Sequence, residues 1–428
     1  MPRVLVISNT ALKRSNSNGL SILNVLSAIP VSNIASFYIQ STFPDRGVAA
    51  THFRLTDSEK MHGFLFGGRD GTIIDDPTIP ACDETLDVQD SSVKGKESFF
   101  RHDVRDFIWK WGYWNKKKFY RWIEGFAPTV ILFMNGRSPF MFDITRGLAK
   151  RFDLPVVYFT SEDEYWHPAT NFWDRILRKK LRKATIKLNK YVKHVVAFHE
   201  KLGKMYEDEF HLPVTVIMPS SLLKPVEEVN EKGNWLYAGN LKPYRFESLL
   251  DIAQALQSVG PTKLIDVYSN DLDDEIRSFL SGCSNVIFHE PVGRDQLDGI
   301  RRRASVLLHF ESFSAEAKPL IQNAFSSKIA DCLALGIPFF VYAPNYCGFS
   351  SYFERNADAV CYVSKKDGLE PAIKALVGDA NYRASLGASA ILLAKANHNQ
   401  SVNAEIIRTA TNFNVPNYDG GEYQESRL

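Results

Sequence analysis

Short apolar runs that alternate with amphipathic stretches constrain the fold of this chain more than any other feature. Strands are predicted at Arg3 to Asn9, Ile34 to Gln40, Thr129 to Asn135, Pro155 to Thr160 and His194 to His199, with helical periodicity between most of them. A second series of the same kind extends from Trp235 to Tyr342. Strands that alternate with helices form parallel sheets with right-handed crossovers. The sequence therefore predicts an α/β protein.

The chain is long enough to form two domains. At 428 residues it exceeds one ordinary core, and the charged, irregular stretch from Pro219 to Gly233 is the best candidate for a linker. We predict two Rossmann-like, doubly wound domains that face each other across a cleft, at 1–222 and 233–412, followed by a polar tail at 413–428. Residues 41 to about 104 have little periodicity, which predicts a partly irregular insertion in the first domain.

The segment from Asn323 to Pro338 predicts an anion-binding helix that leads into a buried strand. The residues from Ser326 to Lys328 open the helix, where free backbone N–H groups and the positive end of the helix dipole favour a phosphate. Asp331 lies about one turn inside. Gly336 and Pro338 end the helix as a left-handed cap and a breaker do. Serine-rich helix starts are also common caps, but the combination favours phosphate binding.

Composition and cysteine spacing exclude several classes of protein. The net charge of +2 argues against bulk binding of nucleic acid. The five cysteines are odd in number and lack CxxC spacing, which fits unpaired thiols better than a disulfide framework or a zinc site. No window approaches the ~18 apolar residues that a spanning helix needs. We expect a cytoplasmic protein, or one that is peripheral on the cytoplasmic face of a membrane.

The stretch from Trp235 to Phe353 resembles the retaining glycosyltransferases of family four, a group that includes many polysaccharide-building enzymes and has two Rossmann-like domains (GT-B). In that family, two glutamates separated by seven residues precede a Gly-x-Pro, and Asn323 and Asp331 stand at their positions here. The resemblance implies that Asp331 holds the ribose of a UDP- or GDP-linked sugar and that Asn323 lies where the family contacts the donor sugar. It also implies that the backbone amides of Ser326, Ser327 and Lys328 bind the phosphates.

A second segment of the resemblance follows the strand at Trp235. The family clamps the diphosphate with an Arg and a Lys after this strand, and here Asn240 stands at the Arg position and Arg245 at the Lys position, next to Gly239. Val292 ends a run that resembles the segment that reads the nucleotide base. The resemblance implies a nucleotide sugar as donor substrate, and we expect no essential metal or other cofactor. The Asp-x-Asp of Asp271 to Asp273 is better explained as a helix start than as a metal motif.

The first domain is expected to bind the acceptor, a glycan or a lipid-linked glycan. The resemblance points to Asn18, Gly19 and the loop from Ser161 to Trp166. Glu162 or Asp163 is suited to orienting an acceptor hydroxyl, although an acidic cluster before a helix is the commoner explanation of such residues.

The predicted activity is that of a nucleotide-sugar-dependent hexosyltransferase that retains the anomeric configuration. Arg245 and Lys328 would stabilise the leaving diphosphate, and Glu162 would act on the acceptor. Two alternatives stay open. One is a sugar-nucleotide epimerase or phosphorylase of the same fold. The other is a catalytically silent nucleotide-sugar-binding scaffold, which the asparagines at 240 and 323 make plausible.

Residues 173–193 hold nine Lys or Arg against one acid, with apolar residues at helical spacing. Such a helix can lie on an anionic membrane surface, or it can pack its apolar face on its own sheet while its cations are solvated. Both interpretations stay open. A second stretch places four tryptophans between 109 and 122 beside Lys116, Lys117 and Lys118, and the two together favour a lipid-linked acceptor. Core packing is the commoner use of tryptophan.

Overall fold

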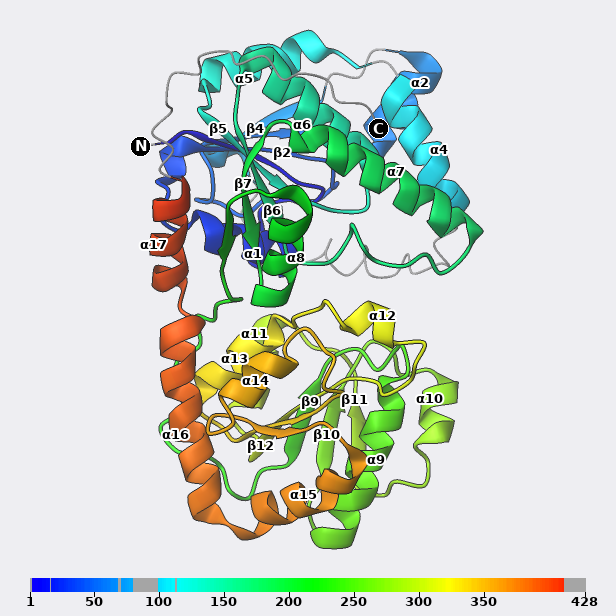
Figure 1. Ribbon diagram of the computed structural model, residues 1–428, viewed down its shortest axis with the longest axis vertical. Helices are drawn as coiled ribbons and strands as arrows, with labels where there is room; N and C mark the ends of the chain where they lie inside the picture. The colour runs from blue at the N-terminus through cyan, green and yellow to red at the C-terminus, as the bar shows by residue number, and fades with distance from the viewer. Residues whose placement is uncertain (1, 16, 68–70, 80–98, 112–113, 412–428) are drawn as a thin grey trace.

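The computed structural model describes residues 2–15, 17–67, 71–79, 99–111 and 114–411. Within them it confirms the predicted α/β fold: two parallel-sheet domains lie one above the other in Figure 1, each with helices on both faces of its sheet.

The sheet of the first domain has eight strands in the described part of the chain, in the order β4-β3-β2-β1-β5-β6-β7-β8. These are β1 (Val4–Ile7), β2 (Ile34–Tyr38), β3 (Thr51–Arg54), β4 (Thr72–Asp75), β5 (Val130–Met134), β6 (Val156–Thr160), β7 (Val192–Ala197) and β8 (Val214–Val216). All pairings are parallel except that of β4 with β3. The central strands are fully buried, as expected for a parallel sheet covered on both faces.

Helices α1 (Ser17–Leu26), α2 (Asp57–Phe66), α4 (Phe99–Trp111), α5 (Lys116–Phe126), α6 (Pro139–Phe152), α7 (Phe172–Asn189) and α8 (Glu200–Phe210) belong to this domain. Helices α4 and α5 are separate elements, since α5 has its own cap at Asn115. Trp109, Trp114 and Trp122 lie in the core, whereas Trp111 is 73% exposed.

The prediction of an irregular insertion at 41–104 was wrong for much of that segment. It contains β3, α2 and β4, which extend the sheet at its edge. The two strands are four residues long and mix polar with apolar side chains, so they lack the composition by which buried strands are recognised. Helix α2 starts with a capping box between Thr56 and Glu59. Part of the insertion, including residues 68–70 of its Gly-rich loop, lies outside the described residues, as does the tail at 413–428.

Helix α7 packs its apolar face inward. Leu177, Leu181, Ala184 and Leu188 belong to the core of the first domain, and the helix contacts α4 and α6. Its exposed cations are Arg175, Lys179, Arg182, Lys183 and Lys187, and Lys190 follows directly after it. The apolar stripe seen in the sequence is therefore core, and only the cationic face and the first turn of the helix meet solvent.

The second sheet has the order β11-β10-β9-β12-β13-β14 and is parallel throughout. Its strands are β9 (Trp235–Ala238), β10 (Ile265–Tyr268), β11 (Val286–His289), β12 (Val306–Phe310), β13 (Phe339–Tyr342) and β14 (Cys361–Val363). Its helices are α9 (Arg245–Val259), α10 (Asp274–Phe279), α11 (Arg294–Arg301), α12 (Lys318–Ile321), α13 (Lys328–Leu335), α14 (Ser350–Arg355), α15 (Leu369–Gly378) and α16 (Ala380–Asn397). The strand order reverses between β9 and β12, where ligands bind in such sheets.

The predicted end of α13 is confirmed and its predicted start is corrected. Gly336 has φ 69° and caps the helix in the left-handed region. A Cβ at this position would lie 2.5 Å from Ile391 of α16, so only glycine allows the two helices to pack this closely. The helix itself begins at Lys328, two residues later than Ser326.

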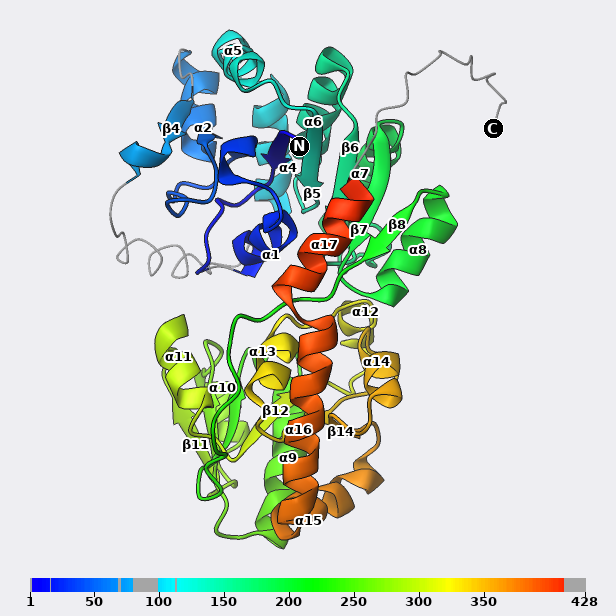
Figure 2. The ribbon, with the colours of Figure 1, turned by 90° about the vertical axis from the view of Figure 1, so that its left-hand side faces the viewer.

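The chain crosses between the domains twice, at the segment following β8 and at the break between α16 and α17 (Gln400–Thr411). Helix α17 packs against α1 and β8, and Ile407 joins the core of the first domain. Figure 2 shows the path of this helix back to the first domain. The sequence had placed this helix with the second domain because of its position in the chain. His398 ties the two crossings together, with Nδ1 2.7 Å from Pro219 O and Nε2 2.9 Å from Tyr352 Oη.

The inward face of α7 can be tested by stability. Leu181→Ala should lower the free energy of unfolding by about 2–5 kcal/mol, because it leaves a cavity beneath the helix. Lys187→Ala, on the exposed face of the same helix, is the matched control and should change it by less than about 0.5 kcal/mol. Urea unfolding followed by tryptophan fluorescence measures both. Equal unfolding midpoints for the two variants would contradict the inward packing of Leu181.

Candidate functional site

A cleft of about 450 Å³ separates the domains where the carboxyl ends of the two sheets face each other. The first domain contributes residues after β1, β5 and β6, together with Arg178 of α7. The second contributes residues after β9 and β12 and the segment from Asn323 to Lys328. Most residues that the sequence assigned to a donor and an acceptor are thus gathered in one cavity.

The segment that leads into α13 offers backbone donors to the cleft. The amides of Ser326, Ser327 and Lys328 donate to no acceptor within the described residues, whereas the next amide, that of Ile329, donates to Ser326 O. Free N–H groups at the start of a helix form a site for an anion. The local structure therefore has the donors expected from the sequence, although the helix starts later.

Lys328 adds a charge at the same place. Its side chain is half-buried, and its ammonium lies against Gly239, where a Cβ would collide with it and would also lie 2.9 Å from Tyr237 Oη. Burial, with the neighbouring Arg245 and Arg301, lowers the pKa of Lys328 to about 8. No hydrogen-bond partner for this ammonium is found among the residues that the structure describes. This part of the cleft therefore lacks a negative charge that would balance the Lys328 ammonium.

Arg245 lies beside it, as the first residue of α9. Its Nε and Nη2 donate to the two carboxylate oxygens of Glu311 at 2.6 and 3.2 Å, and Nη1 donates to Lys242 O at 2.9 Å. The guanidinium expected to grip a diphosphate therefore holds a carboxylate in this structure. Sequence analysis missed Glu311, although a carboxylate at the carboxyl end of a buried strand was a usable signal.

His309, on β12, was also missed. It is 7% exposed, lines the cleft, and has no hydrogen bond at Nε2, which lies 3.6 Å from Glu311 Oε1. Burial, together with the charges of Arg245 and Lys328, lowers the pKa of His309 to about 3, so the ring is neutral.

The opposite wall of the cleft is acidic, with two arginines among the acids. Arg178 Nη1 donates to Glu164 at 2.7 Å, and Arg137 Nη2 donates to Asp174 at 3.0 Å. Burial raises the pKa of Glu164 to about 7 against the opposing effect of Arg178. Glu162 is exposed at the rim, and Asn18 lies at the first turn of α1. Arg178 was hidden in the sequence because it belongs to a run of solvated cations.

Asp163 and Asn323 join the two walls. Asn323 Nδ2 donates to Asp163 Oδ2 at 2.8 Å, and the other oxygen of Asp163 accepts from Trp166 N at 2.7 Å. His199 Nε2 lies 3.0 Å from Asn323 O, and its Nδ1 accepts from Leu202 N, so the neutral ring both caps α8 and donates across the cleft. The asparagine at the family's glutamate position thus meets a carboxylate, where a second carboxylate would be repelled.

Four predicted residues do not line the cleft, namely Asp331, Val292, Gly19 and Gly239, of which Gly239 lies beneath the Lys328 ammonium. Asp331 accepts from Ser221 Oγ at 2.6 Å and from Arg301 Nη1 at 3.3 Å, so it fastens the interdomain segment to the second domain. Val292 is half-exposed after β11, and Gly19 is buried within α1. Asn240, by contrast, lies at the rim of the cleft.

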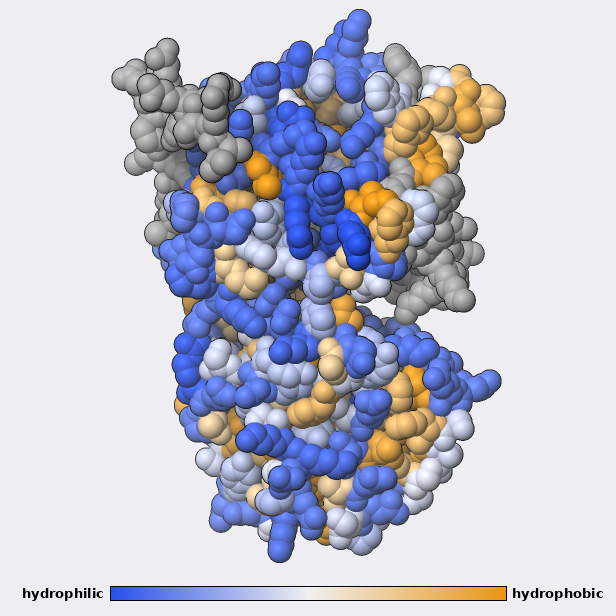
Figure 3. All heavy atoms as spheres, turned by 45° about the vertical axis from the view of Figure 1, so that its right-hand side comes forward, coloured by the Kyte–Doolittle hydropathy of each residue, from blue (hydrophilic) through white to orange (hydrophobic). Residues whose placement is uncertain are grey.

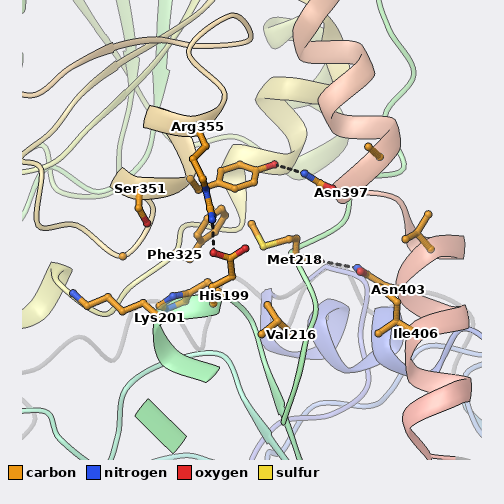
Figure 4. Close-up of a pocket in the computed structure, with 15 residues that line it drawn as sticks. His199, Lys201, Val216, Met218, Phe325, Ser351, Arg355, Asn397, Asn403 and Ile406 are labelled. Atoms are coloured by element: carbon orange, nitrogen blue, oxygen red, sulfur yellow. Dashed lines mark hydrogen bonds and ion pairs between the residues drawn. The ribbon is translucent and has the colours of Figure 1, made fainter. Parts of the chain in front are cut away.

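A smaller pocket of about 270 Å³ lies behind the cleft at the domain junction (Figure 4). Phe325 lines both cavities and separates them. Glu200 and Arg355 form an ion pair of 2.5 Å across this junction, and Asn403 donates to Met218 O. The pocket is therefore built at the place where the chain crosses between the domains.

No group of three or more side chains suited to a metal occurs in the described part of the chain. Asp273 caps α10, and Asp271 accepts from the amides of Leu241 and Lys242, in agreement with the structural interpretation of this pair. No helix among the described residues is long and apolar enough to cross a bilayer.

No protein family and no curated protein sequence matches the chain. Solved structures do. HepE of Anabaena, in complex with UDP and glucose, aligns with a TM-score of 0.60 and 12% identity over 96% of this chain and 99% of HepE. WaaG, a glycosyltransferase involved in lipopolysaccharide biosynthesis, aligns with a TM-score of 0.56 and 13% identity over 96% and 100%. The UDP-forming α,α-trehalose-phosphate synthase of Burkholderia xenovorans aligns with a TM-score of 0.53 and 10% identity over 95% and 99%.

At these identities the likeness establishes the fold, which is that of the two-domain GT-B glycosyltransferases. It covers nearly the whole of each chain, so the expected architecture of two facing domains is confirmed.

The lowered pKa of Lys328 predicts how the binding of an anion beside it depends on pH. A diphosphate bound there would favour the charged ammonium, so affinity for UDP-glucose as a probe should fall as the pH rises through about 8, approaching tenfold per pH unit. Isothermal titration between pH 7 and 9.5 measures this. Lys328→Arg, which stays charged, should flatten the decline. The same decline in wild type and Lys328→Arg would remove Lys328 from the site.

Proposed function

We propose that the protein is a glycosyltransferase that moves a sugar from a nucleotide sugar to a hydroxyl of a glycan or lipid-linked glycan. One observation carries the proposal. Three unused backbone amides and the Lys328 ammonium converge on one wall of the cleft, opposite a wall of carboxylates, within a GT-B fold. HepE, of the same fold, has been solved with UDP and with UDP-glucose.

The donor wall suits the departure of a diphosphate. When the bond from the anomeric carbon to the phosphate oxygen breaks, its electron pair stays on the diphosphate, where negative charge builds. The amides of 326–328 and the cations of Lys328 and Arg245 are fixed before the reaction and act in a partly dry site, where such stabilisation is strongest.

The acceptor wall suits a sugar hydroxyl. Carboxylates such as Glu162 and Glu164 accept hydrogen bonds from hydroxyl groups and hold them in position. In the proposed mechanism the hydroxyl attacks from the face that the diphosphate leaves, its proton passes to a phosphate oxygen, and the anomeric configuration is retained. Asn323 and Asp163 lie between donor and acceptor and would contact the transferred sugar.

A catalytically silent nucleotide-sugar-binding protein is the second candidate. It is favoured by Asn323, whose amide is engaged by Asp163, and by Asn240, which supplies no charge at the position of the family's arginine. An epimerase or phosphorylase shares the donor wall but needs no separate acceptor wall.

These candidates are separated by a panel of UDP- and GDP-linked sugars. We expect one donor to raise the melting temperature and to release nucleoside diphosphate only when a glycan acceptor is present, with the product's anomeric configuration, read by NMR, matching that of the donor. Arg245→Ala and Lys328→Met should weaken donor binding at least about tenfold. Lys374→Met, an exposed cation on α15, is the control.

Stabilisation without turnover would favour the silent protein, and turnover of the donor without acceptor would favour the epimerase or phosphorylase. No response to any nucleotide sugar would refute the proposed function.

We also propose that the protein docks on an anionic membrane, although not through the length of 173–193. The adjacent helices α2, α4 and α7 expose Met61, Phe64, Leu65, Phe66, Val104, Phe107, Trp111, Phe172 and Trp173. Hydrophobic side chains gather at the upper right of Figure 3, on the first domain. Aromatic residues favour the lipid interface, and the exposed cations of α7 complement anionic headgroups. This supports a lipid-linked acceptor and a peripheral position on the cytoplasmic face.

Vesicle flotation tests this surface. The protein should float with vesicles that contain phosphatidylserine, and the double variant Phe66→Ser, Trp111→Ser should reduce the bound fraction about tenfold. Leu392→Ser, an exposed leucine of the second domain, is the matched control. Equal flotation of all three proteins would contradict the proposal that this surface binds membranes. The wild type could instead fail to bind vesicles and self-associate in a way that the double variant abolishes. That result would assign the surface to contact with a second copy of the chain.

A further inference from the structure

Glu311 is a buried carboxylate to which the proposed transfer gives no role. It lies at the carboxyl end of β12, its side chain is 7% exposed, and it lines the cleft. Its two oxygens occupy two N–H groups of Arg245, and its backbone O accepts from Ser248 Oγ at 2.8 Å. The backbone bond holds the residue in place, and the side chain occupies the part of Arg245 that a phosphate would use.

The charges around Glu311 are few. Within the described residues, the titratable groups that face it are Arg245 from α9, Lys328 from α13, His309 from β12, Tyr237 from β9 and Cys347 from the loop after β13. The pKa of His309 is lowered, and burial raises the pKa values of Tyr237 and Cys347, so these three are neutral near pH 7. Two cations and one carboxylate remain.

A nucleotide sugar brings one negative charge on each phosphate, so its arrival would leave this buried site with an excess of negative charge. Burial of uncompensated charge is costly, and a like charge favours the protonated form of a carboxyl group. Burial already raises the pKa of Glu311, against the lowering effect of Arg245. Among the groups of the donor wall, Glu311 is therefore the one whose protonation an incoming diphosphate would favour.

We propose that Glu311 is a donor-binding residue that takes up a proton as the diphosphate arrives, releases Arg245 to the phosphates, and donates a hydrogen bond to them as a carboxylic acid. The proton comes from solvent and ends on a Glu311 oxygen, and no covalent bond of the donor changes in this step. The inference rests on the proposed function, since it assigns a role within the same site.

Calorimetry on the wild-type protein tests the proposal. UDP-glucose is titrated at pH 6.5 in two buffers that differ in their enthalpy of ionisation, and the difference gives the protons taken up. We expect at least about half a proton per nucleotide, with affinity declining between pH 6 and 7.5. Lys328, with a pKa of about 8, is almost fully charged at pH 6.5 and adds little to the uptake measured there. Binding without uptake would overturn this inference alone. If no nucleotide sugar binds, the proposed function fails and this inference with it.

Two variants assign the proton. Glu311→Gln should abolish the proton uptake. It should also bind UDP-glucose several-fold more tightly than wild type at pH 7.5, because Arg245 then does not have to break an ion pair with a carboxylate. A merely structural role would weaken binding instead. Glu316→Gln, an exposed residue five positions later, should keep the wild-type uptake. Uptake that persists in Glu311→Gln would overturn the assignment.

If Glu311→Gln does not fold, an infrared difference spectrum of the wild type decides the question. Binding of UDP-glucose should produce a new carboxylic-acid C=O band, and its absence would overturn the proposal.

Discussion

The site depends on the burial of charge between two sheets. Where two parallel sheets turn their carboxyl ends toward each other, the loops that follow the strands meet in a partly dry space, and every charged group there requires a partner. Arg178 has Glu164, Arg245 has Glu311, and Asp163 has the amide of Asn323. Lys328 is left with neighbouring cations. The electrostatic imbalance of the cleft is therefore local, and it lies beside three free amides.

Polar side chains also hold the two domains together. The neutral His199 ring binds the donor wall and caps α8 of the first domain, while Asp331 and His398 hold the interdomain crossings. Asp331 illustrates how an acidic residue at an expected position can face away from the expected site. It lies one turn inside the helix, as predicted, but its carboxylate is turned toward α11 and the linker rather than toward the cleft.

Much of the fold could be predicted because buried parallel strands are apolar on both faces, and β1, β5, β6, β12 and β13 are visible as such in the sequence. The edge strand β4 and its neighbour β3 were missed because both are short and mix polar with apolar side chains. Among the residues that line the cleft, local signals in the sequence pointed to 326–328 and Arg245. Glu311 and Arg178 were missed because their roles arise from contacts with residues distant in the chain, such as the pair between positions 245 and 311.

The return of α17 to the first domain has a consequence for biosynthesis. Because Ile407 completes a core begun by β1 and α1, the first domain is discontinuous in the chain. A fragment that stops at residue 222 would lack this helix and expose the surface that it covers. On the ribosome the first domain cannot close until α17 has been synthesised, so the second domain is able to fold before the first is complete.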